Sequence, residues 1–307
     1  MFDIKDKILE VNSILESTLP ASMSEGSIED AMRYSVLNGG KRLRPIMLLE
    51  AFKLFCADTD TQRLIAWPFA AAIECIHSYS LVHDDLPAMD DDTYRRGRLT
   101  THKKYGHAMG VLTGDALLNY AFEIMSEAAV SVSALRSPEM TADLLARVSK
   151  AMHEVSGQAG YTGMIYGQVR DCAQDTEVTA DDIIKTYELK TSCLFEAALA
   201  AGALLGGADD KQVKDIKKAG YHIGVAFQLR DDILDEVATF EELGKDIGSD
   251  SKNGKKTYLS VMGRDKTDKK LIAQIDEAQK AIGRLPGDHA FFEELCGFIR
   301  DISVKQD

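Results

Sequence analysis

The chain has 307 residues, of which 45% are hydrophobic and 28% charged, and its formal net charge is −13 at pH 7. A chain of this length buries most of the surface that its unfolded form exposes, and the composition is that of a soluble globular protein. The acidic balance argues against nucleic-acid binding and against a polybasic membrane anchor.

Helical periodicity dominates the sequence, and residues typical of helix ends punctuate it. Ser27-x-x-Asp30 and Thr179-x-x-Asp182 are capping pairs, and no strand-like alternation exceeds about five residues. We therefore predict an all-α fold, with one domain over residues 1–307 and a mobile loop at Glu241–Lys256. The predicted helices start at Ser27, Pro45, Pro68, Thr179 and about Lys211. They are predicted to end near Gly39, Leu86, Gly206 and Asp235.

The cysteine count and the apolar runs bear on the cell compartment. The five cysteines are odd in number, and no two stand at Cys-x-x-Cys spacing, so a disulfide framework and a cysteine zinc site are disfavoured. No basic N-terminal stretch precedes an apolar run, and no apolar run reaches the roughly 18 residues of a membrane span. We expect a cytoplasmic protein without a signal peptide or a membrane span.

Two acidic clusters carry the strongest chemical signal. Five aspartates fall within nine residues at Asp84-Asp85 and Asp90-Asp91-Asp92, and three more occur in Asp231-Asp232-Ile233-Leu234-Asp235. Acidic runs are usually solvated helix ends, but each cluster follows an apolar helical pattern, where carboxylates oppose the helix dipole. Neither cluster matches a calcium EF-hand, whereas magnesium takes one or two carboxylates and shares substrate phosphates. The clusters thus predict a polyphosphate held through several Mg²⁺ ions.

A second metal hypothesis comes from Glu74-x-x-His77, the unit that di-iron helical bundles use twice. The sequence holds no second copy of it, so we treat this as the minor alternative. Without any metal, His77 is a buried structural histidine.

Cationic residues stand where a diphosphate could bind. Gly39-Gly40-Lys41-Arg42-Leu43-Arg44-Pro45 precedes a helix whose free N–H groups favour anions, although a turn with solubilising charges fits as well. Arg95-Arg96-Gly97 suits phosphate oxygens or neutralises the nearby aspartates. Lys190-Thr191 interrupts an apolar helical pattern, so the lysine needs a partner. Gly163 and Gly167 favour close helix packing that places Gln168 and Asp171 at the end of one stripe.

Together these motifs resemble the trans-isoprenyl diphosphate synthases, above all the short-chain bacterial type that makes farnesyl diphosphate. Asp84-Asp85 with Asp90 matches the first aspartate-rich motif of that family, and Asp231-Asp232 with Asp235 matches the second. The resemblance covers about residues 28–262, with leucine at 99 and 259 where the family has proline. Further matches in the family's order are His77, Gly114-Asp115, Gly167-Gln168, Phe227-Gln228 and Gly244-Lys245.

The resemblance implies a helical bundle of the isoprenoid synthase type with a central cavity. It also implies head-to-tail condensation of isopentenyl diphosphate with dimethylallyl or geranyl diphosphate through an allylic carbocation. The implied ligands of three Mg²⁺ ions are Asp84, Asp85, Asp90, Asp231 and Asp235. Catalytic roles are implied for Asp84, Asp85, Asp90, Arg95, Lys190, Asp231, Asp232 and Lys245. Substrate contacts are implied for Lys41, Arg44, His77, Arg95, Arg96, Lys190, Thr191, Gln228 and Lys245.

Product length follows from the same resemblance. In the family an aromatic residue at the position of Tyr79, next to Ser80, is a floor for the growing tail, which indicates a C15 product. Without the resemblance, Tyr79 is a half-buried core tyrosine. Geranyl (C10) and geranylgeranyl (C20) products are alternatives, as are a terpene cyclase and a non-catalytic subunit of a heteromeric prenyl synthase. A homodimer is expected from the family.

Overall fold

The computed structural model of the chain describes residues 3–173, 178–237 and 256–301. The helices up to residue 133 are α1 (Lys5–Thr18), α2 (Ile28–Val36), α3 (Leu43–Lys53), α4 (Thr59–Thr61), α5 (Trp67–Asp84), α6 (Thr101–Tyr105) and α7 (His107–Ser133). The later ones are α8 (Pro138–Ala159), α9 (Met164–Cys172), α10 (Ala180–Tyr187), α11 (Cys193–Gly206), α12 (Asp210–Val237), α15 (Tyr258–Met262), α16 (Arg264–Ile282) and α17 (Ala290–Arg300). The predicted all-α fold is confirmed.

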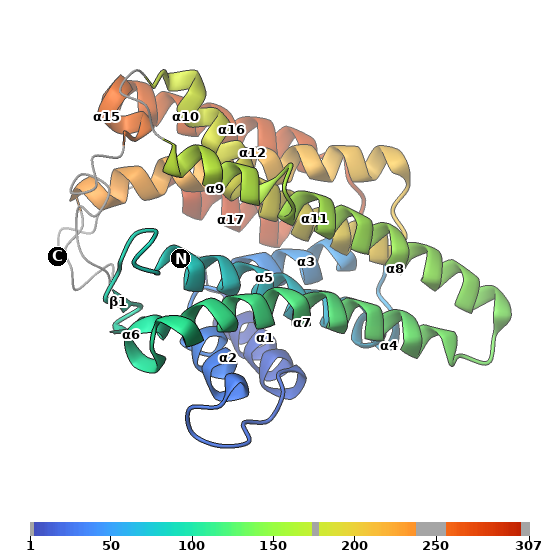
Figure 1. Cartoon of the computed structure of the whole chain (residues 1–307). Coiled ribbons are helices and arrows are strands. Elements are labelled where there is room, and N and C mark those ends of the chain that lie inside the picture. Colours follow the sequence, from blue (N-terminus) through green and yellow to red (C-terminus); the bar gives the residue numbers. More distant parts are fainter. Residues whose placement is uncertain (1–2, 174–177, 238–255, 302–307) are drawn as a thin grey trace.

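The helices pack as a bundle with two halves. Figure 1 shows the helices up to α7 in the lower half of the view and those from α9 onward in the upper half. In the lower half α5 packs along α7, and in the upper half α12 packs along α16. Helix α11 joins the halves, because it contacts α3, α8 and α12.

Apolar faces explain why these helices pack as they do. Helix α11 is buried along nearly its whole length, as expected for a helix that is apolar on all sides. Its Gly202 is needed for the approach of α3, since a Cβ there would lie 2.1 Å from the Leu48 carbonyl oxygen. Helix α8 instead buries one stripe, at helical spacing, against α11 and α7: Leu144, Val148, Ala151, Val155 and Ala159.

The predicted helix starts are confirmed at both capping pairs. The Ser27 side chain accepts a hydrogen bond from the Asp30 amide, and Thr179 and Asp182 form a complete capping box. Helix α5 ends at Asp84, two residues earlier than predicted, and Pro87 follows. Most of the predicted loop at Glu241–Lys256 lies outside the described residues.

Two helical stretches are longer and more apolar than the sequence analysis allowed. Thr59–Asp84 and Ala180–Gly206 have the length and composition of membrane spans, but 72% and 78% of their most apolar windows are buried inside the bundle. Their apolar character therefore serves the core of the protein. Each stretch is continuous because a π-helical turn, η1 (Gln62–Ala66) or η2 (Glu188–Ser192), joins its α-helical parts.

Two further features differ from the prediction. A two-residue hairpin, β1 (Tyr94–Arg95) and β2 (Arg98–Leu99), stands between α5 and α6, and it is too short to leave a periodic signal in the sequence. Its turn residues Arg96 and Gly97 both have positive φ, as a tight hairpin turn requires. Gly163 precedes α9 instead of lying within a helix, and a Cβ there would lie 2.1 Å from the Gln158 carbonyl oxygen.

Candidate active site

A cavity of about 1160 Å³ opens between the two halves of the bundle. Its wall combines charged or polar groups with a larger apolar lining that includes Leu81, Val111, Leu118, Met164 and Leu194. The structure brings many of the predicted site residues together in this wall: Lys41, Arg44, His77, Tyr79, Ser80, Asp84, Arg95, Arg96, Lys190, Thr191, Gln228 and Asp231.

Five predicted residues are not part of that wall. Asp85, Asp90, Asp232 and Asp235 are absent from the lining, and Lys245 lies outside the described residues. Consecutive residues of a helix point about 100° apart, so Asp231 and Asp232 of α12 point in different directions, while Asp85 and Asp90 come after the last residue of α5. The wall therefore receives one carboxylate from each cluster, Asp84 at the end of α5 and Asp231 on α12.

The first cluster is organised around the end of α5. The Asp90 amide donates to the Asp84 carbonyl oxygen at 2.9 Å, which folds the loop back onto the helix end. Asp85 is 3% exposed and accepts a 2.6 Å hydrogen bond from Arg95 Nε. Burial raises the pKa of Asp84, and it raises the pKa of Asp85 to about 6 although Arg95 opposes that shift. Asp85 thus holds Arg95 at the cavity edge.

The second cluster is held by a tyrosine. Asp232 is 6% exposed and accepts a 2.5 Å hydrogen bond from the Tyr187 hydroxyl, which in turn accepts one from the Tyr258 amide. Asp232 therefore ties α12 to α10 and α15, while its neighbour Asp231 faces the cavity. Nearby, the Thr191 hydroxyl donates to Gln228 Oε1 at 3.0 Å and joins two predicted substrate contacts.

Magnesium fits this arrangement better than a closed metal centre does. Over the described ranges, no three His, Cys, Asp or Glu side chains gather into a ligand set. Magnesium needs no such set, because it takes one or two carboxylates and completes its shell with water and phosphate oxygens. The di-iron alternative is wrong, since Glu74 forms a buried 2.6 Å ion pair with Arg42.

All three cations of the loop before α3 reach the cavity wall, but the Arg42 side chain is also bound in the core. Arg42 adopts a left-handed conformation with φ 50° and turns into the core, where it contacts Glu74, Asn12 and the Val36 carbonyl oxygen. Lys41 and Arg44, on either side of it, line the cavity. Of the three cations in this loop, Arg42 is thus a structural anchor.

Aromatic rings flank the two cavity cations of this loop. The Arg44 guanidinium lies 4.4 Å from the centroid of the Phe195 ring, and burial lowers the pKa of Arg44 to about 10. Lys41 Nζ lies 5.8 Å from the Phe227 centroid and 5.7 Å from that of Phe298. Sequence analysis missed Phe195 and Phe298, because an apolar residue in an apolar helix has no local signal for such a role.

Arg96 and His77 complete the cationic side of the cavity. Arg96 donates to the Gly39 carbonyl oxygen and lies flat on Gly40, where a Cβ would be 2.6 Å from its Cζ. Burial lowers the pKa of His77 well below its usual value, and the positive charges of Arg44 and Arg96 add to the effect. His77 is therefore a neutral hydrogen-bonding group among cations.

Lys190 stands in the π-helical turn η2 and meets α9. Its Nζ forms a 2.7 Å ion pair with Asp171, and a Cβ at Gly167 would lie 2.2 Å from the Lys190 backbone nitrogen. The close packing predicted for Gly167 is confirmed, and Gln168 beside it lies in the cavity wall. Asp171 and Lys190, which the sequence analysis treated as separate features, thus form one ion pair.

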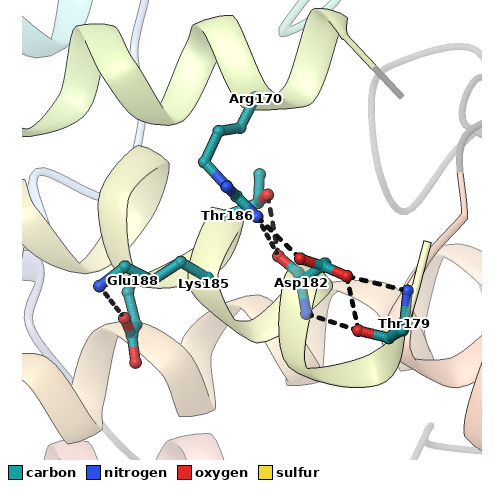
Figure 2. A network of polar contacts seen from close by, with 6 residues as sticks. All are labelled: Arg170, Thr179, Asp182, Lys185, Thr186 and Glu188. Atoms are coloured by element: carbon teal, nitrogen blue, oxygen red, sulfur yellow. Dashed lines mark hydrogen bonds and ion pairs between the residues drawn. The ribbon is translucent and has the colours of Figure 1, made fainter. Parts of the chain in front are cut away.

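A network at the start of α10 holds α9 in place (Figure 2). Arg170 of α9 donates to the carbonyl oxygen and to Oδ1 of Asp182, at 3.5 and 3.2 Å. The other carboxylate oxygen of Asp182 accepts a 2.6 Å bond from the Thr179 hydroxyl. The capping box thus also fixes the helix that carries Asp171.

A cavity wall that holds one carboxylate from each of two aspartate motifs, together with several cations, is typical of enzymes that act on diphosphates. Residues 25–287 match the polyprenyl synthetase family. The chain belongs to that family. It is a short-chain trans-prenyl diphosphate synthase, which is a trans-prenyltransferase.

Its relatives include enzymes with different product lengths. The chain is 37% identical to a farnesyl diphosphate synthase of Geobacillus stearothermophilus over 273 residues, 89% of this chain and 87% of the relative. It is 38% identical to a geranylgeranyl diphosphate synthase of Cyanophora paradoxa, covering 92% of this chain and 90% of that one. A solved geranyltransferase of Helicobacter pylori, complexed with magnesium and isoprenyl diphosphate, matches with a TM-score of 0.80 at 29% identity and covers 96% of this chain and 94% of its own.

Proposed function

We propose that the protein condenses isopentenyl diphosphate with dimethylallyl and then geranyl diphosphate, and that its main product is the C15 compound farnesyl diphosphate. The identities of 37% and 38% to a C15 and a C20 synthase do not choose between these lengths. The observation that carries the choice is Tyr79, which stands in the cavity wall five residues before Asp84 on the same helix and is 6% exposed.

Tyr79 acts as the floor because of its size and its lack of charge. Burial, with the nearby Asp84 charge, raises the pKa of Tyr79 to about 12, so the phenol stays neutral beside a hydrocarbon tail. Ser80 lies next to it in the wall, and its hydroxyl donates to the His77 carbonyl oxygen within the same helix.

Asp84 and Asp231, supported by Asp85, Asp90 and Asp235, are the residues that would hold three Mg²⁺ ions. Bound there, the ions supply positive charge to the diphosphate that leaves the allylic substrate. The carboxylate oxygens of the wall suit such a hard cation. Asp232 supports the site through its hydrogen bond to Tyr187, which fixes the helix that carries Asp231.

The chain's own cations bind and orient the allylic diphosphate. Arg95 and Lys190 lie in the wall beside Asp84, and Lys245 is proposed to join them. Thr191 and Gln228 already bond to each other and frame this side of the cavity. Preorganised charges of this kind stabilise the negative charge that grows as the carbon–oxygen bond breaks.

Isopentenyl diphosphate is held on the opposite side. Lys41, Arg44 and Arg96 provide the charge, and neutral His77 provides a hydrogen bond without accepting a proton. The double bond of isopentenyl diphosphate then attacks the allylic carbocation, a carbon–carbon bond forms, and a proton passes to the released diphosphate. The apolar lining excludes water, which would otherwise capture the cation.

The cysteines and the exposed residues of α7 bear on the location and the assembly of the protein. We propose a cytoplasmic homodimer. The structure joins none of the five cysteines, all of which it describes, in a disulfide. Leu112 and Val130 of α7 are 54% and 60% exposed, as expected for a helix that a second copy covers. Light scattering on the purified protein measures its oligomeric state.

A product assay tests the function. The protein is incubated with labelled isopentenyl diphosphate and dimethylallyl diphosphate, with and without Mg²⁺, and the dephosphorylated alcohols are sized. A Mg²⁺-dependent C15 alcohol is the expected result. A C10 or C20 alcohol would overturn the proposed product length but not the proposed condensation reaction. No elongation by folded protein would point to a cyclase or a non-catalytic subunit.

A further inference from the structure

The ring of His83 lies directly on the backbone of α7. Its Nε2 donates to the Val111 carbonyl oxygen, with 3.0 Å between the two atoms. A Cβ at Gly114, one turn further along α7, would lie 2.0 Å from the same nitrogen and 2.2 Å from Cδ2. Any side chain at position 114 would therefore occupy the space of the imidazole, and α7 carries glycine there although glycine weakens a helix interior.

The imidazole of His83 also contacts the proposed floor of the cavity. His83 and Tyr79 are four residues apart on α5, so they share one helix face. Their ring centroids are 5.9 Å apart with planes at 80°, an edge-to-face arrangement. Both residues line the cavity. The imidazole thus contacts both the α7 backbone and the phenol, and both rings stand at the cavity wall.

We propose that His83, seated on Gly114, is a positioning residue that fixes the ring of Tyr79 and thereby the depth of the cavity. Gly114 is then a determinant of product length that acts through His83. This inference rests on the proposed function, in which Tyr79 stops the growing tail.

Two substitutions shift the product in opposite directions. His83→Ala removes the ring that abuts Tyr79 and enlarges the cavity by the volume of an imidazole, so longer products follow. Gly114→Ala drives the imidazole off α7 towards Tyr79 and the cavity, so shorter products follow. In the double variant the new methyl group meets no imidazole, and the product pattern is that of His83→Ala alone.

The experiment measures the C10, C15 and C20 alcohols formed by each variant at matched turnover. We expect ratio changes of about tenfold, the discrimination that a pocket exerts on a small change in apolar length. Gly157→Ala is the matched control, because a Cβ at this helical position meets nothing within 4 Å and it lies outside the cavity wall. Thermal melting confirms that each variant is folded.

The outcomes separate this inference from the proposed function. A wild-type enzyme that makes no C15 product overturns the proposed product length. If the wild type makes C15 and Tyr79→Ala lengthens the product, unchanged products from His83→Ala overturn the inference alone. A double variant that keeps the shortened product of Gly114→Ala would also overturn the inference alone. Should Gly114→Ala fail to fold, His83→Ala decides the matter by itself.

Discussion

Arg42 and Glu74 form an ion pair inside the core, with Arg42 Nη1 2.6 Å from Glu74 Oε1 and side chains that are 1% and 2% exposed. Arg42 precedes the first turn of α3 and Glu74 belongs to α5, and both residues reach the same cavity wall as Lys41 and Arg44. The ion pair anchors the loop that places Lys41 and Arg44 in the cavity wall.

Glu74→Ala is expected to destabilise the protein by about 3–5 kcal/mol, because it leaves the buried Arg42 charge without a counter-ion. The free energy of unfolding from urea titration at neutral pH measures the loss. Arg42→Met/Glu74→Leu is the control, since it removes both charges and should recover most of the stability. A loss below about 1 kcal/mol for Glu74→Ala would contradict this account of the pair.

Gly40→Ala should weaken the binding of isopentenyl diphosphate. Gly40 has φ +115°, and its new Cβ would lie 2.6 Å from Arg96 Cζ and displace that guanidinium. Gly39→Ala is a matched control, because φ is +77° there and a Cβ meets nothing within 4 Å. We expect a KM for isopentenyl diphosphate about tenfold higher in Gly40→Ala than in Gly39→Ala, or ~1.4 kcal/mol, with the allylic KM little changed. Equal KM values in the two variants would remove Arg96 from this site.

Asp84→Ala and Asp231→Ala should each lower kcat by roughly a hundredfold or more while the fold stays intact, since each removes the carboxylate that its cluster places in the cavity wall. Turnover at saturating Mg²⁺ and circular dichroism are the measurements. Asp143→Ala is the control, because that side chain is 56% exposed on α8. Near-normal turnover by either cavity variant would refute the metal-binding role.

Tyr79→Ala should lengthen the product beyond C15, because it removes the ring that closes the cavity. Tyr79→Phe keeps the ring and should keep the C15 product, which separates the bulk of the side chain from its hydroxyl. The sizes of the alcohols measure both effects. A C15 product from the alanine variant would show that another residue is the floor.

Glu196 should make stability fall with rising pH. Burial raises the pKa of Glu196 to about 7, although Lys217 opposes the shift. The native state therefore holds this proton more tightly than the unfolded chain does. The resulting stabilisation is full below the unfolded pKa of about 4.3 and is lost as the pH rises through about 7.

Between about pH 5 and 8, the loss should be on the order of 2 kcal/mol in the free energy of unfolding. Glu196→Gln should flatten the pH profile of Tm, while Glu139→Gln at the exposed start of α8 should not. Parallel profiles for wild type and Glu196→Gln would contradict the assignment.

The sequence predicted the features that depend on local chemistry. The caps at Ser27 and Thr179 are confirmed because a side chain needs only its own next turn to form them. The aspartate motifs and cations could be recognised by residue type, and Asp84, Asp231, Lys41 and Arg95 do lie in one cavity wall. The roles of these residues in binding and catalysis stay predictions.

Features that depend on distant partners could not be predicted. Whether an aspartate faces the cavity or a neighbour depends on helix rotation, so Asp85 with Arg95 and Asp232 with Tyr187 were not foreseen. The seat of His83 on Gly114 joins two helices whose relation only the fold defines. The π-helical turn at Lys190 was also missed, because one extra residue scarcely disturbs an apolar period.

That turn lets one continuous helical stretch serve two surfaces. A π-helical turn holds one residue more than an α-helical turn does. It therefore rotates the side chains of the following helix relative to those before the turn. Residues from Cys193 onward keep their apolar sides in the core, while Lys190 and Thr191 face the cavity. Removing a single residue here would leave every side chain of the site in the sequence and yet rotate Lys190 away from Asp171 and the cavity. The spacing of the polypeptide, as much as the identity of its residues, thus shapes the cavity wall.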